Sequence, residues 1–172
     1  MVSPRFATLF AFTDWLEQTR IGTAIAEGRY LFPIIEGIHL IALAVAVGLL
    51  MLVDLRLMGV FLPKVPPRVL HRQLLPYVLA GFALVVTAGV LLLTSEASTV
   101  FKSPPWPFKL VFIVLAGFNA VYFEFVLSRR SHALPAQGPL PVSVRRVGFA
   151  SFALWVLVIT CGRLIPYITT WG

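Results

Sequence analysis

The 172-residue chain has few charged residues and a single cysteine. Charged residues make up 12% of the sequence, and seven acidic residues face fourteen basic ones. The lone Cys161 excludes an internal disulfide and a metal site built from several cysteines. The sequence also contains no phosphate-binding loop, no dinucleotide-binding glycine fingerprint, no HExxH motif and no nucleophile elbow. Enzymes that depend on those motifs are therefore not indicated.

Apolar residues are abundant instead. They make up 59% of the chain, and the mean hydropathy is +0.91. A soluble domain of this length cannot bury that much apolar surface, so the composition indicates a helical membrane protein of one domain. Four runs lack Asp, Glu, Lys and Arg altogether, and they cover residues 37–53, 73–95, 110–123 and 147–162.

With their flanks included, the four runs reach the length that a bilayer requires. We therefore predict an all-α fold, a polytopic membrane four-helix bundle over residues 30–172. Its helices are expected at about 30–59, 70–94, 106–128 and 144–166. Proline-containing connections separate them.

Residues 1–29 precede the bundle as a separate helical segment. An apolar stripe recurs there at helical spacing and comprises Phe6, Leu9, Phe10, Thr13 and Leu16. Together with Trp15, this stripe predicts an interfacial amphipathic helix on the outer membrane surface. A helix packed over the mouth of the bundle as a lid is the alternative.

The basic residues predict the orientation of the bundle. They gather in the first and third connections, as Arg56, Lys64, Arg68, Arg72, Arg129, Arg130, Arg145 and Arg146, whereas the second connection carries only Lys102 and Lys109. Because positive residues mark the cytoplasmic side, both termini are expected outside, in a bacterial inner membrane. The same distribution explains the net charge of +7 without a nucleic acid partner.

His39 is the most informative single residue. It lies about nine residues into the first spanning helix, or about 13 Å below its outer end. An ionisable side chain at membrane depth is a functional hypothesis by default. His39 is a candidate axial haem ligand or proton acceptor, and the alternative is a histidine hydrogen-bonded to a neighbouring helix. Glu36 lies one turn above it on a neighbouring face.

Small residues form stripes on the other spanning helices. In the second helix the predicted interior stripe comprises Pro76, Ala80, Ala83, Thr87 and Thr94, and in the fourth it comprises Gly148, Trp155 and Gly162. Such stripes permit close helix packing, and they would equally leave a slot for a flat macrocycle. Trp155 is therefore a candidate for cofactor contact.

Two cations are expected at the outer mouth of the bundle, beside Glu36 and His39. Lys109 begins the third helix and Arg163 ends the fourth. They could hold haem propionates or an anionic substrate by charge-assisted hydrogen bonds, or simply extend to the interface. At the inner end we expect Asp54, Arg56 and Glu124 to have a mostly structural role, with Arg56 paired to Glu124. His71 is expected to be a solvated interface residue.

Three segments resemble a known family. The run Ile38–Arg56, with its early histidine and later arginine, looks like the first core helix of HemJ-type protoporphyrinogen IX oxidases. Trp106-Pro-Phe-Lys109 resembles the lysine motif of that family, and Leu75-Pro76 through Gly89 is similar in pattern. The resemblance spans about residues 35–120 and extends to CopD-type copper-resistance membrane proteins. It implies that His39 ligates haem b, with Arg56 and Lys109 near haem or porphyrin.

The sequence thus predicts a haem b-binding redox protein with His39 as axial and metal ligand. Glu36, Arg56, Lys109, Trp155 and Arg163 are its other candidate cofactor residues, and the chemistry is porphyrinogen oxidation or quinone-linked electron transfer. One alternative is a cofactor-free small transporter or copper-handling protein. Another is a membrane anchor subunit for a periplasmic enzyme. Homo-oligomers are compatible with each reading.

Overall fold

The computed structural model describes residues 4–128 and 140–168, with side chains described for 10–125 and 140–168. Its helices are α1 (Pro4–Glu17), α2 (Arg20–Glu27), α3 (Leu31–Met58), α4 (Pro67–Ser95), α5 (Ala97–Lys102), α6 (Pro105–Tyr122), the π-helix η1 (Phe123–Ser128) and α7 (Val142–Leu164). No strand occurs in these ranges, so the all-α prediction is confirmed. Arg129 and Arg130 of the predicted third connection lie outside the described residues.

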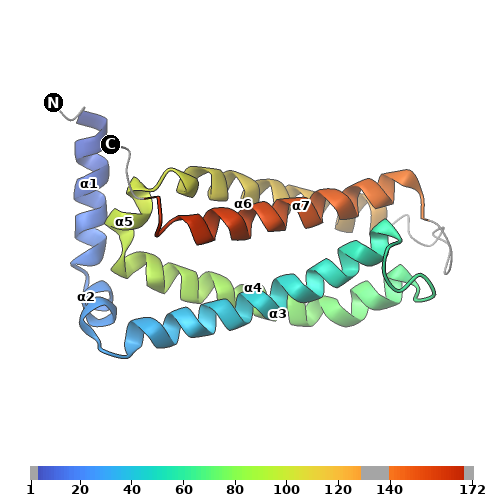
Figure 1. Ribbon diagram of the computed structural model, residues 1–172, viewed down its shortest axis with the longest axis horizontal. Coiled ribbons are helices and arrows are strands. Elements are labelled where there is room, and N and C mark those ends of the chain that lie inside the picture. Colours follow the sequence, from blue (N-terminus) through green and yellow to red (C-terminus); the bar gives the residue numbers. More distant parts are fainter. Residues whose placement is uncertain (1–3, 129–139, 169–172) are drawn as a thin grey trace.

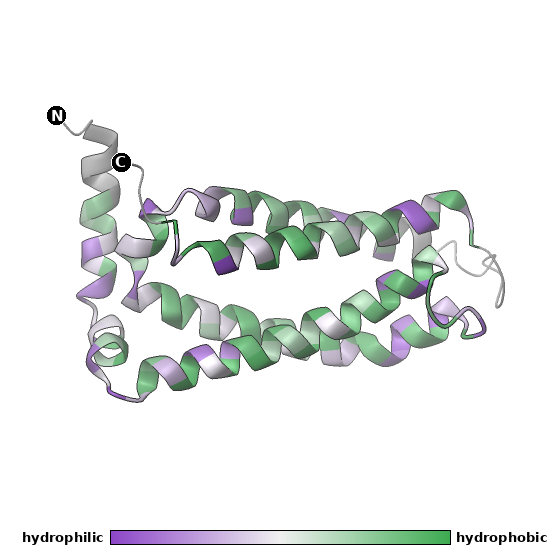
Figure 2. Ribbon diagram, viewed as in Figure 1, coloured by the Kyte–Doolittle hydropathy of each residue, from purple (hydrophilic) through white to green (hydrophobic). Residues whose placement is uncertain are grey.

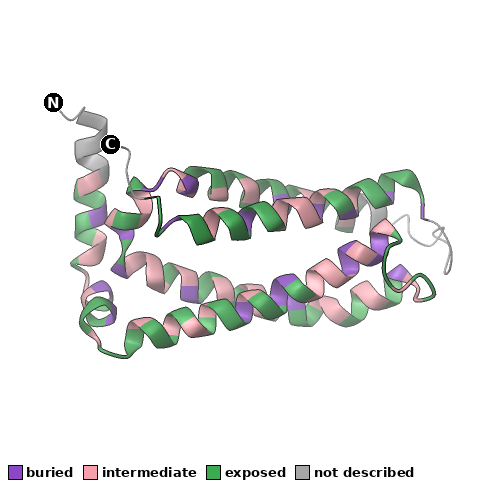
Figure 3. Ribbon diagram, viewed as in Figure 1, coloured by how far each residue is buried: buried purple, intermediate pink, exposed green. Residues whose placement is uncertain are grey.

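Four of these helices are long and apolar enough to cross a membrane: α3, α4, α6 with the start of η1, and α7. Their bounds agree with the predicted spans to within three residues, and α3 alone is about 42 Å long at 1.5 Å per residue. Hydrophobic residues occur along the whole length of all four helices, and hydrophilic residues lie mainly towards the helix ends (Figure 2). Outward faces are mostly exposed, as side chains that contact lipid must be (Figure 3). The fold is that of a multi-pass membrane protein.

Proline and glycine mark several of the helix boundaries. Pro67 and Pro105 stand in the first turns of α4 and α6, where the missing N–H costs no hydrogen bond. Gly59 ends α3 with a left-handed φ of 81°, and its N–H bonds back to the carbonyl of Arg56. Pro76 lies inside α4 without ending it.

The spanning helices form two pairs, α3 with α4 and α6 with α7, and α3 also packs on α7. The pairs come together at the end where α3 finishes and α7 begins, and they diverge towards α1 (Figure 1). We call the first the basic end and the second the α1 end. Glycine sets the contacts between helices: a Cβ at Gly81 would lie 2.8 Å from the Cβ of Ala46, and one at Gly148 would lie 2.9 Å from the carbonyl oxygen of Asp54.

The predicted interior stripe of the second helix is wrong. Four of its five residues, Pro76, Ala80, Ala83 and Thr87, are exposed on α4, and only Thr94 is half-buried. The face against α3 carries Val78, Gly81, Val85, Ala88 and Gly89 instead. Small side chains occur on both faces of this helix. Because lipid and a neighbouring helix are both apolar surroundings, residue size alone does not distinguish the two faces.

The N-terminal segment is two helices rather than one. Thr19 separates them, and its Oγ1 accepts a hydrogen bond from the N–H of Gly22 at 3.2 Å. α1 lies across the end of the bundle (Figure 1) and packs on α5 and α4. Thr13 is fully buried whereas Trp15 is 62% exposed, so α1 covers the bundle with one face and keeps an aromatic anchor on the other. The side chains of Phe6 and Leu9 lie outside the described residues.

Candidate functional site

His39 is half-buried on α3 and contacts α4. Its Nδ1 lies 3.0 Å from the backbone carbonyl oxygen of Val85. The imidazole also rests on Gly89, because a Cβ there would lie 3.1 Å from Cε1. Gly89 therefore makes the space that the ring occupies. With Nδ1–H donating to Val85, the lone pair is on Nε2, and Nε2 has no hydrogen-bond partner among the described residues.

Lys109 lies near the α1 end of α6 and extends along α7. A Cβ at Gly162 would lie 3.1 Å from its Nζ, so glycine again provides the space for a polar side chain. Lys109 and Glu36 are the two charged residues within electrostatic range of His39. The structure thus brings three of the predicted site residues, His39, Lys109 and Glu36, into one region of the bundle.

Trp155 lies at a depth similar to that of His39. It is nine residues before the end of α7, or about 13.5 Å, whereas His39 is eight residues after the start of α3, or about 12 Å. The Trp155 indole packs against Phe82 of α4, with ring centroids 4.7 Å apart. This aromatic pair connects the two helix pairs at a level farther from the α1 end than Lys109.

Arg163 is exposed at the α1 end and interacts with Tyr167. Its Nη2 donates a hydrogen bond to the Tyr167 hydroxyl at 2.9 Å, and its guanidinium lies 5.1 Å from the centre of the same ring. Arg163 therefore lies at the mouth of the bundle, held by its own helix end, rather than beside His39.

Arg56 lies at the basic end, away from the other candidates. It is seventeen residues along α3 from His39, or about 25 Å. The side chain is fully buried, and Nε and Nη2 donate to the backbone carbonyls of Val65 and Pro63. The predicted pairing of Arg56 with Glu124 is wrong, because the connection after α3 turns back over the guanidinium and supplies its acceptors.

Glu124 instead contacts His71. The Oε2 of Glu124 lies 3.6 Å from the Nε2 of His71, and the imidazole meets Phe123 edge-on at 5.2 Å between ring centroids. His71 was expected to be solvated, yet its side chain is only 18% exposed. Glu124 and Phe123 both belong to the π-helical turn η1, a local change of register that the apolar pattern does not reveal.

Asp54 is the polar residue whose environment the sequence analysis missed. It is 2% exposed on α3, contacts Ser151 of α7, and its Oδ2 has no partner among the described residues. The Nη1 of Arg56 is likewise buried and unpartnered. The signal was present in the sequence, since an acidic residue inside an apolar span is a functional hypothesis by default. No three His, Cys, Asp or Glu side chains gather as a metal site within the described part of the chain.

Three carboxylates lie near one another at the α1 end. Burial raises the pKa of Glu96, and the carboxylates of Glu36 and Glu17 raise it further. Glu17 also accepts a hydrogen bond from the N–H of Ser98 at 2.7 Å, which ties α1 to α5. The mouth above His39 is therefore acidic on the side of α1 and α4.

These features define a small all-helical membrane protein in which one imidazole bonds across two spanning helices. Residues 12–168 match the sequence model of DUF6644, a family of unknown function, and the chain belongs to that family. No curated protein and no solved structure matches the chain. The resemblance to HemJ-type and CopD-type proteins is not tested by these comparisons and stays a prediction.

Proposed function

We propose that this protein binds haem b in the membrane and serves redox chemistry, with His39 as the residue that would hold the haem through Nε2. The observation that carries the proposal is the contact between His39 Nδ1 and the Val85 carbonyl. Ligating histidines usually donate their second ring N–H to a carbonyl or carboxylate, which fixes the tautomer and the ring orientation.

The surrounding residues fit such a group. Lys109 offers a cation within electrostatic range of His39, as a propionate requires. Trp155 and Phe82 offer apolar aromatic surface at a similar depth. The other two histidines of the sequence are His71, at the basic end, and His132, outside the described residues. His39 is therefore the single histidine ligand that the α1 half of the described bundle supplies.

Bound haem would supply one-electron chemistry. The chain would supply His39 as a ligand, orient its imidazole through the Val85 carbonyl and the space at Gly89, and place the Lys109 charge nearby. Porphyrinogen or quinol is the proposed electron donor. The Lys and Arg distribution supports a bacterial inner-membrane location with α1 on the periplasmic side, which reporter fusions to either end would test.

An absorption spectrum of the detergent-purified protein, before and after dithionite, tests the haem proposal. We expect a Soret band with α and β bands that sharpen on reduction, and loss of all three in His39→Ala. His71→Ala is the matched control, because it removes the other described histidine at the opposite end of the bundle. A wild-type protein that stays colourless after hemin is added, or a His39→Ala variant that keeps its haem, would remove the assignment.

A cofactor-free proton path is the second candidate, and the unpartnered Oδ2 of Asp54 favours it. Buried carboxyl groups inside membrane spans commonly carry protons in pumps and transporters. Proton flux into liposomes that contain the protein, lost in Asp54→Asn and retained in the exposed-site variant Glu124→Gln, would support this function. Absence of flux in a folded protein would remove it.

A further inference from the structure

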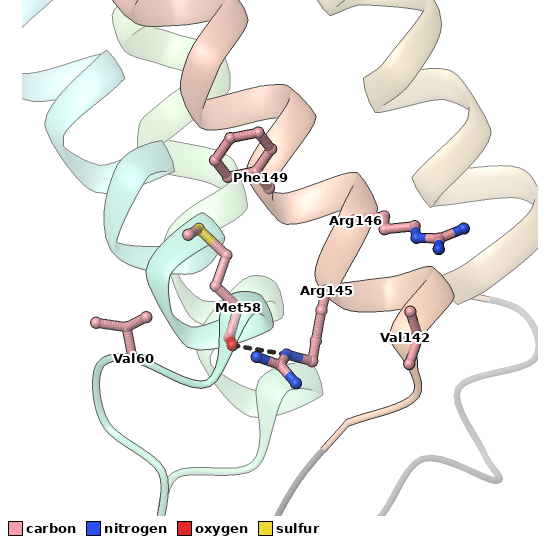
Figure 4. A pocket seen from close by; sticks show the side chains of 6 residues that line it. All are labelled: Met58, Val60, Val142, Arg145, Arg146 and Phe149. Carbon is pink, nitrogen blue, oxygen red and sulfur yellow. Dashed lines mark hydrogen bonds between the residues drawn. The ribbon is translucent and has the colours of Figure 1, made fainter.

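A pocket lies at the basic end of the bundle, between the end of α3 and the start of α7. It is an open pocket with a volume of about 330 Å³. Figure 4 shows its lining, which comprises Met58, Val60, Val142, Arg145, Arg146 and Phe149. Because one spanning helix ends and another begins here, the pocket lies at the level where the hydrocarbon core meets the lipid headgroups.

The walls of the pocket are apolar and face outwards. Val60, Val142 and Phe149 are each 60% exposed or more, so their side chains lie open to the membrane rather than to the core of the bundle. A water-filled or small-anion site would leave this apolar surface wet. An occupant with a hydrocarbon portion would cover it.

Two arginines supply the polar part of the pocket. The Nε of Arg145 donates to the carbonyl oxygen of Met58 at 3.1 Å, which holds the guanidinium across the gap between α7 and α3. Its Nη groups have no hydrogen-bond partner among the described residues. Arg146 points away from Met58 and marks the opposite edge (Figure 4). A fixed guanidinium with free Nη groups is suited to bind phosphate oxygens at two points.

We propose that this pocket binds an anionic membrane phospholipid, with its phosphate at Arg145 and an acyl chain along Val142 and Phe149. Charge complementarity argues for this occupant. Arg145 and Arg146 both line the pocket, and basic pockets between spanning helices are typical sites for anionic headgroups. The proposal is independent of haem binding.

Native mass spectrometry in a mild detergent tests the proposal, with cardiolipin titrated against phosphatidylcholine. We expect the wild-type protein to retain cardiolipin selectively, and Arg145→Gln/Arg146→Gln to bind it at least about tenfold more weakly. The matched control is Lys64→Gln/Arg72→Gln, which removes the same charge from the same end and should retain cardiolipin like the wild type. The single variant Arg145→Gln should lose more affinity than Arg146→Gln. Circular dichroism and size-exclusion profiles establish that each variant is folded.

The apolar wall is tested separately with Phe149→Ser, which keeps both arginines. This variant should weaken binding of long-chain phosphatidylglycerol while leaving binding of its short-chain analogue unchanged. Equal losses in the two double variants would mean that only the overall charge matters, and would overturn the proposal. Equal retention of phosphatidylcholine, full displacement by inorganic phosphate, or a change of oligomeric state in place of lipid loss would overturn it as well.

Discussion

Replacing Gly148 by alanine tests the contact that joins the two helix pairs. A Cβ at this position would lie 2.9 Å from the carbonyl oxygen of Asp54 and 2.9 Å from the Cβ of Leu57. Ordinary contacts begin at 3.4 Å, so the shortfall is about 0.5 Å against each of the two neighbours. One neighbour is backbone and the other is the first atom of a side chain, so neither can rotate away. The helices α3 and α7 must separate instead.

Two opposing contributions determine how much Gly148→Ala changes the free energy of unfolding. Overpacking of this kind destabilises by about 1–3 kcal/mol. Alanine is itself favoured over glycine inside a helix by about 0.5–1 kcal/mol. Gly117→Ala in α6 isolates the second term, because nothing lies within 4 Å of a Cβ at that position. Gly148→Ala should therefore be less stable than Gly117→Ala by about 1–3 kcal/mol.

Unfolding of the purified protein in mixed micelles of rising SDS fraction measures this difference. Tryptophan fluorescence and circular dichroism should give coincident transitions for both variants. A difference below about 0.5 kcal/mol, or a Gly148→Ala variant more stable than its control, would mean that α3 and α7 do not approach as closely as described.

Two further variants probe the ends of the bundle. Burial raises the pKa of Glu96, and the carboxylates of Glu36 and Glu17 raise it further. Folding therefore favours the protonated carboxyl, and the folded state loses stability as the pH rises through the folded-state pKa of Glu96. Glu96→Gln should therefore raise the thermal midpoint above that of the wild type at pH 7 but not near pH 4, and an equal gain at both pH values would contradict this. Arg56→Met removes both hydrogen bonds that hold the connection after α3, and tryptic cleavage after Lys64 should accelerate about tenfold. An unchanged cleavage rate would show that the connection is held by other contacts.

The positions of the spanning helices followed from the sequence because their signal is local. Uncharged runs, flanking prolines and helix length decide where a helix can cross a bilayer, and none of these depends on the partner helix. Rotation about the helix axis does depend on the partner. The stripe that begins at Pro76 and Ala80 shows the difference. The predicted bounds of α4 along the chain agree with the structure, but the stripe that was expected to face the interior is exposed and does not face α3.

The candidate site divides in the same way. His39 was singled out because an imidazole in an apolar run is rare, and its contact with α4 was among the expected alternatives. The partners of Arg56 and Glu124 were not predictable, because they depend on how one loop folds back and on a π-helical turn. Asp54 was given a structural role, although its unpartnered carboxylate oxygen separates it from an ordinary ion pair.

A helix of this bundle can bury polar side chains only where neighbouring helices pack against it. Seven residues of α3 are buried, against two of α6, because α3 packs on both α4 and α7. Two polar residues of α3 use that coverage: His39 bonds to α4, and Asp54 contacts α7. A ligand must be held rigidly to fix a cofactor, and a helix contacted on two sides supplies more rigidity than one open to lipid. The same reasoning makes α3 the helix on which a haem ligand or a proton carrier can be supported.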